Sequence, residues 1–118
     1  MPFEKLTITV LETSSETERI LKVAGPLTIS TASDFQQRVL SSKTAKTFIL
    51  DCSEVSYIDS SGIGAIVSTH TTCVNSGRRL ALAGLTDRIR AFMKVSWVEN
   101  ILSIYPTVKE AQQALAKA

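Results

Sequence analysis

The fold is decided by the stretch Val55-Ser-Tyr-Ile-Asp-Ser-Ser-Gly-Ile-Gly-Ala-Ile-Val67, which predicts the end of a strand followed by a capped helix. Asp59 is a good N-cap, because its carboxylate can accept hydrogen bonds from the unpaired N–H groups of the first helical turn. Ser60 falls in that turn, where backbone donors and the helix dipole favour an anion, so an exposed hydroxyl there is well placed to carry a phosphate. Gly62 and Gly64 keep the turn slim, so that another protein can approach its backbone closely.

Asp-Ser or Ser-Ser before an apolar run is also an ordinary capping sequence with a purely structural role. The position of this Asp-Ser-Ser sequence in the chain favours a functional role in addition to capping. It follows Phe48-Ile-Leu-Asp51, which has the composition of a buried strand, and corners from strand to helix are where α/β folds place their sites.

Five strands are expected along the chain. Leu6, Ile8 and Val10 alternate with threonines, as in a strand with one wet face. The other expected strands are Arg19 to Ala24 as a hairpin partner, Phe48 to Leu50, Leu80 to Ala83, and a last one near Ile101 to Tyr105. The third is apolar throughout, which is typical of a parallel strand covered by helices on both faces.

Four helices are expected between and after these strands. The first is capped by Thr31 or Ser30 and places Phe35, Val39 and Leu40 on one face, and the second runs from about Ser60 to Asn75 and stops at Gly77. The third helix has an apolar face made of Leu85, Ile89, Phe92 and Met93. The fourth follows a capping box that begins at Thr107 and buries Val108, Ala111 and Leu115. The order β-β-α-β-α-β-α-β-α predicts a single α/β domain over residues 1–118. Its sheet is mixed, with four to five strands, and largely parallel after the opening hairpin.

Composition excludes several classes of function. The chain has 118 residues, 13 Lys and Arg against 11 Asp and Glu, and no basic run longer than Arg78-Arg79, whereas nucleic-acid binders concentrate their charge. Its apolar runs are too short to span a membrane, and Met1-Pro-Phe-Glu-Lys-Leu lacks the features of a signal peptide. These features predict one core and a cytoplasmic location without nucleic-acid binding or membrane insertion.

Catalytic and metal-binding interpretations find little support. Cys52 and Cys73 have the setting of small buried hydrophobic residues, and with one histidine they cannot form a usual closed zinc site. His70 is expected to lie beside the core with its ring nitrogens hydrogen-bonded. It lies ten residues after Ser60 on the same helix, about 15 Å along the helix axis, which is too far for it to act as a base for the Ser60 hydroxyl. Neither a Gly-x-Ser-x-Gly elbow nor a phosphate-binding glycine loop is present. We therefore expect no enzyme activity, metal or cofactor.

The corner sequence resembles the Asp-Ser-Ser-Gly phosphorylation motif of the STAS-domain anti-sigma factor antagonists, and the resemblance extends over nearly the whole chain. Val23-Ala-Gly-Pro-Leu-Thr28 is similar to the family's Gly-Glu-Leu-Asp strand end, while Leu80 to Gly84 and Arg88 to Lys94 are similar to its later strand and helix. The chain departs from the family at Pro26, where an acidic residue is usual, and at Thr28, where Asp is usual and lies near the phosphorylated serine.

The resemblance implies a partner switch. An anti-sigma factor that is also a serine kinase, of the histidine-kinase-like ATPase fold, would bind the unmodified domain, release its sigma factor and phosphorylate Ser60, and a serine phosphatase would reverse the step. Asp59, Ser61 and Gly62 would support the phosphosite. The partner surface would comprise Gly25, Thr28, Ile29, Ile63, Gly64 and Val67, with at least one of Ile63 and Val67 expected in the core.

A second interpretation stays open. STAS subunits also serve as scaffolds in bacterial membrane complexes that transport lipids, where the corner commonly reads Asp-Thr-Ala-Gly. The Ser60-Ser61 pair favours the switch, while Pro26 and Thr28 favour the scaffold slightly.

Overall fold

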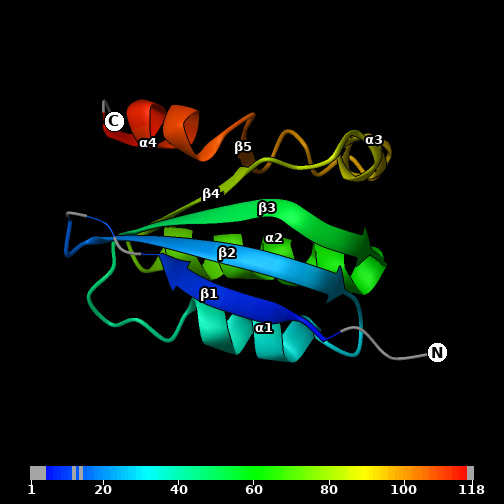
Figure 1. Ribbon diagram of the computed structural model, residues 1–118, viewed down its shortest axis with the longest axis horizontal. Helices are drawn as coiled ribbons and strands as arrows, with labels where there is room; N and C mark the ends of the chain where they lie inside the picture. Colours follow the sequence, from blue (N-terminus) through cyan, green and yellow to red (C-terminus); the bar gives the residue numbers. More distant parts are fainter. Residues whose placement is uncertain (1–4, 12, 14, 117–118) are drawn as a thin grey trace.

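A five-stranded sheet forms the centre of the molecule in the computed structural model, which describes residues 5–11, 13 and 15–116 (Figure 1). The strands lie in chain order: β1 (Thr7–Leu11), β2 (Glu18–Leu27), β3 (Thr47–Ile58), β4 (Arg79–Ala83) and β5 (Ser103–Tyr105). β1 pairs with β2 in antiparallel fashion, and the following neighbours are parallel. The predicted mixed sheet with an opening hairpin is therefore confirmed.

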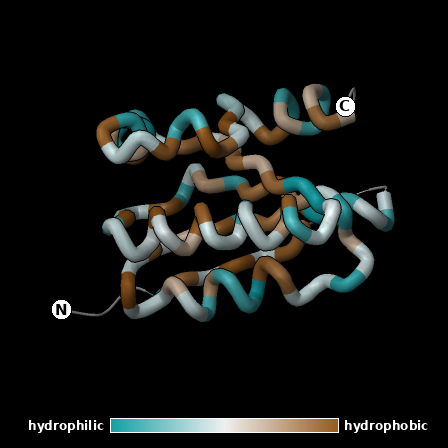
Figure 2. The backbone as a smooth tube through the Cα atoms, turned by 180° about the vertical axis from the view of Figure 1, so that it is seen from behind, coloured by the Kyte–Doolittle hydropathy of each residue, from teal (hydrophilic) through white to brown (hydrophobic). Residues whose placement is uncertain are grey.

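The four helices of the described residues are α1 (Ala32–Val39), α2 (Ser60–Asn75), α3 (Asp87–Val95) and α4 (Val108–Ala116). Because parallel strands are joined by right-handed crossovers, three crossovers running in the same direction place α1, α2 and α3 on one face. Their buried side chains share the larger core with alternate residues of the central strands, and α4 packs with Ile49, Ala81 and Ala83 on the other face. Figure 2 shows α1 and α2 in front of the strands when the molecule is seen from behind.

Several element boundaries differ from those expected. β2 and β3 are longer, since their pairing continues to Leu27 and Ile58. β5 is shorter, because Ile101 and Leu102 donate backbone hydrogen bonds to Val98 in a turn. Leu85 precedes α3 instead of belonging to it, since Thr86 is the N-cap and accepts a hydrogen bond from the N–H of Ile89 at 3.3 Å. By contrast, α2 begins and ends as predicted, and Gly77 after it has a φ of 73°.

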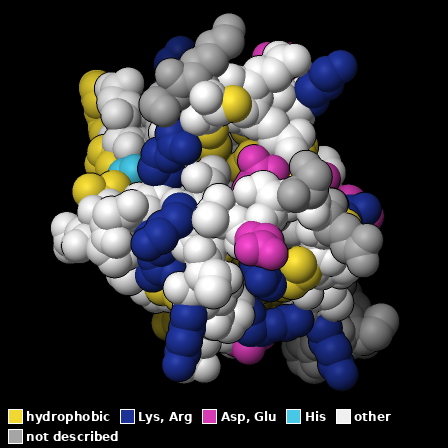
Figure 3. Space-filling view, turned by 90° about the vertical axis from the view of Figure 1, so that its left-hand side faces the viewer, with side chains coloured by type: hydrophobic (Ala, Val, Ile, Leu, Met, Phe, Trp, Pro, Cys, Tyr) yellow, Lys and Arg dark blue, Asp and Glu magenta, His cyan; other side chains and the backbone are white. Residues whose placement is uncertain are grey.

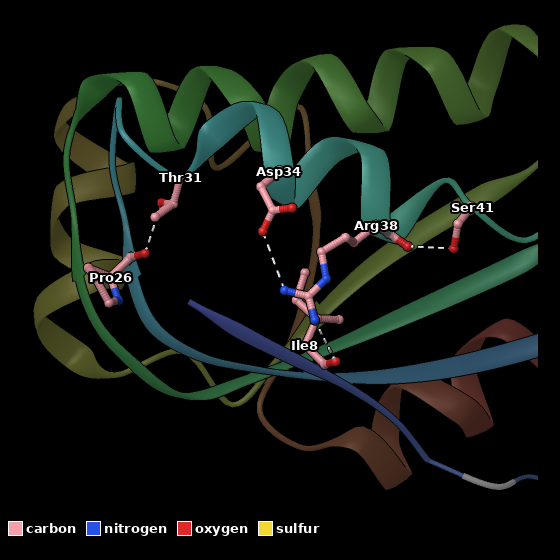
Figure 4. Close-up of polar contacts among 6 residues, drawn as sticks. All are labelled: Ile8, Pro26, Thr31, Asp34, Arg38 and Ser41. Carbon is pink, nitrogen blue, oxygen red and sulfur yellow. Dashed lines mark hydrogen bonds and ion pairs between the residues drawn. The ribbon is translucent and has the colours of Figure 1, made fainter. Parts of the chain in front are cut away.

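The expected side-chain cap of α1 is wrong. Thr31 occupies the N-cap position, but its hydroxyl makes no capping bond. It donates instead to the carbonyl of Pro26 at 2.9 Å and accepts from the N–H of Thr28, closing the loop between β2 and α1 (Figure 4). On the same helix Arg38 pairs with Asp34 and donates to the carbonyl of Ile8, which ties α1 to the edge strand.

α3 ends in a Schellman motif. The N–H of Val98 donates to the carbonyl of Met93 and the N–H of Trp97 to that of Lys94, both at 3.2 Å. Trp97 therefore occupies the position where glycine is usual, with a φ of 63°, and its side chain is 80% exposed. A left-handed conformation costs a residue with a Cβ about 1–2 kcal/mol.

Relief of this strain is our first prediction. Trp97→Gly should stabilise the fold by about 0.5–1 kcal/mol, since the left-handed cost is lost and part of the gain is offset by the greater freedom of an unfolded glycine. Urea unfolding would measure the gain. Trp97→Ala is the matched control, because it removes the indole and keeps the strained backbone. Equal stabilisation by both changes would assign the effect to the exposed indole.

Candidate functional site

Asp59 joins two segments that lie far apart in the sequence. One oxygen of its carboxylate accepts from the N–H of Gly62 at 2.8 Å and caps α2, as predicted. The other oxygen accepts from the N–H of Ile29 at 3.2 Å, and the N–H of Asp59 itself donates to the carbonyl of Leu27. One carboxylate therefore fixes the start of α2 against the loop that follows β2.

Ser60 is the first residue of α2, and its side chain is exposed, whereas Ser61 is half-buried. Within the described residues, the N–H groups of Ser60 and Ser61 have no acceptor, while those of Gly62 and Ile63 are bound to the side chain and carbonyl of Asp59. Free N–H groups at a helix start bind anions well. The corner can therefore accommodate a phosphate on Ser60 without a change of fold.

The two glycines of the corner have different roles. A Cβ placed on Gly62 would lie 2.1 Å from the carbonyl oxygen of Leu27, so this glycine lets α2 pack against the end of β2. It is buried, and its contact is with the domain itself instead of with a partner. A Cβ on Gly64 would meet nothing within 4 Å, and this residue lies exposed one turn after Ser60.

The remaining residues expected on the partner surface separate into surface and core. Ile29 is 76% exposed and adjoins the Asp59 carboxylate, and Val67 is partly exposed. Ile63 is only 5% exposed and belongs to the core, so its expected contact with a partner is wrong. We define the Ser60 surface as Thr28, Ile29, Ser60, Gly64 and Val67.

Gly25 and Thr28 shape the backbone that leads to this surface. Gly25 has a φ of 98°, and a Cβ there would lie 2.3 Å from the carbonyl oxygen of Lys5, so no other residue fits without a shift. Thr28 accepts from the N–H of Ser30 through its hydroxyl and from those of Thr31 and Ala32 through its carbonyl. The Thr28 hydroxyl thus serves as a neutral acceptor within the loop.

Basic side chains gather at the opposite end of the sheet, with some acidic ones among them (Figure 3). The N–H of Arg79 donates to the carbonyl of Lys46 at 2.8 Å, and Arg78 donates to the carbonyl of Ser42, which brings these cations together. They adjoin the start of β3, about 35 Å from its end at roughly 3.3 Å per residue. Since charges are screened over about 10 Å, a phosphate on Ser60 would be compensated by the helix start instead.

Cys52 and Cys73 are buried and unpaired, as predicted. Burial, aided by the nearby Asp51 carboxylate, raises the pKa of the Cys52 thiol to about 12, and burial also raises that of Cys73. In the described part of the chain no three acidic, histidine or cysteine side chains form a group that could hold a metal ion. The Nδ1 atom of His70 is buried without a hydrogen-bond partner there, so the expectation of a satisfied histidine is wrong.

Sequence reasoning missed the hydrogen bond between Asp59 and Ile29 and the contact between Gly62 and Leu27. Both depend on the pairing of β2 with β3, which brings Leu27 opposite Ile58. The family resemblance marked Val23-Ala-Gly-Pro-Leu-Thr28 as a strand end, but the periodicity of residues 19–24 stops before Leu27 and indicates neither contact.

Asp59 should contribute measurably to stability. Asp59→Ala removes a cap worth about 0.5–2 kcal/mol and a second hydrogen bond worth about 0.5–1.5 kcal/mol, so we expect a loss of about 1–3.5 kcal/mol in urea unfolding. Asp34→Ala is the matched control, because it removes an exposed carboxylate whose ion pair with Arg38 contributes about 0.5 kcal/mol or less. Equal losses in the two variants would contradict the bridging role of Asp59.

Comparison with known proteins agrees with this architecture. The family model of the STAS domain matches residues 9–111. The chain belongs to the STAS domain family. In this STAS domain none of the described helices is long and apolar enough to cross a membrane.

Three solved structures illustrate the range of similar proteins. A putative anti-sigma factor antagonist from Thermotoga maritima is 24% identical, with 92% of each chain covered and a TM-score of 0.79. The phosphorylated form of the Bacillus cell fate determinant SpoIIAA is 16% identical, with 92% of this chain and 99% of that one covered and a TM-score of 0.68. A sulfate transporter family protein from Wolinella succinogenes is 20% identical, with 91% and 93% covered and a TM-score of 0.74. At these identities the likeness establishes the fold.

Proposed function

We propose that this STAS domain is an anti-sigma factor antagonist that is switched by phosphorylation of Ser60. The observation that carries the proposal is the exposed Ser60 hydroxyl on the first turn of α2, directly after a capping Asp59 that fixes the neighbouring loop. Solved structures of similar fold support it, among them the anti-sigma factor antagonist SpoIIAA, which is also known in a phosphorylated form.

In the unmodified state the Ser60 surface docks an anti-sigma factor that is also a serine kinase of the histidine-kinase-like ATPase fold, and the sigma factor is released. The exposed apolar side chain of Ile29 and the open backbone at Gly64 offer close contact around a neutral hydroxyl. Because Ile29 is fixed by Asp59, the surface is formed before binding, which lowers the ordering cost of association.

Phosphorylation reverses the interaction through charge. The kinase transfers the γ-phosphoryl group of Mg-ATP to the Ser60 oxygen, which adds about −1.5 to −2 charges at pH 7. Docking would then require desolvation of a dianion beside the Asp59 carboxylate, which is costly without a matching cation. The helix start stabilises the phosphate, so the domain stays folded, and a serine phosphatase restores the hydroxyl. The domain itself supplies the acceptor and carries out no catalysis.

A second function is favoured by different observations. The likeness to a transporter-family structure, together with Pro26 and Thr28 in place of acidic residues, favours a scaffold subunit in a bacterial membrane transport complex. Neighbouring genes distinguish the two functions: a kinase-like anti-sigma factor with a sigma factor, or a transporter ATPase with a permease.

The phosphorylation itself provides the direct test. With the kinase-like anti-sigma factor encoded nearby and Mg-ATP, mass spectrometry should find one phosphate on Ser60. Ser60→Ala should remain unmodified, and the matched Ser61→Ala variant should still be phosphorylated. Phosphate on Ser61 or Thr28 would contradict the assignment, and the absence of phosphate with that kinase would favour the scaffold.

A further inference from the structure

A groove of about 640 Å³ lies between the end of β3 and α3. Its lining consists of Val55, Ser56, Tyr57, Ile58, Thr86, Arg88, Ile89 and Phe92. Figure 1 shows α3 beyond the end of β4, beside the last part of β3. The groove does not belong to the Ser60 surface, and none of its lining residues has a part in the proposed switch.

The topology explains why the groove exists. β4 pairs only with Thr47 to Asp51 of β3, so residues 52–58 continue without a strand neighbour on that side. The chain leaves the sheet at Gly84, whose φ is 73°, and α3 begins at Asp87. Two register shifts between β2 and β3 increase the twist of this overhang. A helix therefore lies where a strand would otherwise close the surface, and the space between them stays open.

The lining is apolar with one cation. Of the lining residues, Val55, Ile58 and Ile89 are buried, while Tyr57 is 58% exposed and Phe92 is half-buried. Arg88 is exposed and is not among the ion-paired cations of the described residues, and no acidic residue lines the groove. By contrast, Arg90 of the same helix pairs with Glu99. A ligand with an apolar body and one negative charge complements this arrangement.

We propose that the groove binds a single-chain amphiphile with a carboxylate head, a medium-chain fatty acid in chemical class. The alkyl chain lies against Val55, Ile58 and Phe92, and the carboxylate pairs with the Arg88 guanidinium, which binds carboxylates in a two-pronged geometry. The volume lies in the range of known ligand pockets, about 300–1,000 Å³. The Thr86 hydroxyl is already engaged in capping α3, so Arg88 is the group that selects the head.

Dodecanoate is the probe for the test. Titration of the full chain below the micelle concentration, followed by calorimetry and by ¹H–¹⁵N correlation spectra, should show saturable binding with one site. The largest shifts should fall in residues 55–58 and 86–92. Decanoate should bind roughly tenfold more weakly, since each buried methylene contributes about 0.8 kcal/mol. Dodecanol, which has the same alkyl chain without the charge, should bind with an affinity about tenfold or more below that of dodecanoate.

Variants identify the groove as the site. Arg88→Met should weaken dodecanoate binding about tenfold while leaving dodecanol unaffected, and Arg90→Met is the matched control that should leave both unchanged. Phe92→Asp should abolish binding; if it fails to fold by circular dichroism, the comparison of Arg88→Met with Arg90→Met decides alone.

The proposal would be overturned by no saturable binding of dodecanoate, by equal weakening in Arg88→Met and Arg90→Met, or by shifts centred outside the two segments. Binding of dodecanol as tight as that of dodecanoate would also exclude the carboxylate-selective site. Because the measurement needs neither kinase nor phosphate, its outcome is independent of the proposed switch.

Discussion

Gly62→Ala is expected to destabilise the domain by about 3 kcal/mol, which is the upper part of the range for overpacking a buried site. The added Cβ would lie 2.1 Å from the carbonyl oxygen of Leu27 and 2.8 Å from the Ile58 side chain. A backbone carbonyl cannot move aside as a flexible side chain can, so α2 must shift away from the end of β2. That shift would also stretch the hydrogen bonds of Asp59 to Gly62 and Ile29. Urea unfolding monitored by circular dichroism measures the loss.

Gly64→Ala is the control for this prediction, because it makes the same chemical change two residues later in the same helix. A Cβ there meets nothing within 4 Å, and alanine is favoured over glycine in a helix by about 1 kcal/mol. We therefore expect stabilisation by up to about 1 kcal/mol. Destabilisation of the same size in both variants would contradict the role of the Leu27 contact, because Gly64→Ala makes the same chemical change without that contact.

Ser60→Asp is expected to weaken binding of the anti-sigma partner at least tenfold, which corresponds to about 1.4 kcal/mol. The change places a permanent negative charge next to Asp59 on the Ser60 surface, and docking must desolvate it. The fold should persist, because a carboxylate in the first turn of a helix is favourable. Ser60→Ala should bind as tightly as the unmodified domain and should not respond to ATP. Calorimetric titration measures the affinities, and thermal melts verify folding.

Thr72→Asp is the matched control for charge, since Thr72 is exposed on the same helix about 18 Å further along its axis. It should leave the affinity unchanged. If Ser60→Asp binds as tightly as the unmodified domain, Ser60 lies outside the interface and the scaffold function is favoured. If Thr72→Asp weakens binding equally, the effect reflects net charge and not the position of Ser60.

The sequence by itself determined the order of elements and the local structure of the corner. The bounds of α2 follow from Asp59 and Gly77, because a cap and a left-handed stop act on the few residues beside them. The apolar run at residues 48–50 identified a strand covered on both faces in the same way. Residue types also predicted the buried cysteines, since a small apolar side chain in an apolar run has few other places to lie.

The tertiary structure alone decided which candidate residues of the corner are buried in the domain and which are exposed to solvent. Ile63 was a candidate for the partner surface and Gly62 for close approach by a partner, and both are buried because α2 packs against the end of β2 at Leu27. The second bond of Asp59 depends on Ile29, thirty residues away, which pairing of β2 with β3 brings into reach.

The groove between β3 and α3 likewise results from the pairing of segments that lie far apart in the sequence. No local pattern reveals that β4 ends seven residues before β3 does, because that depends on the register between strands joined by the whole of α2. Capping residues and hydrophobic periodicity act over one or two helical turns, so they can be recognised in the sequence. Register, overhang and close backbone approach arise from packing between distant segments, so they appear only when those segments are folded together.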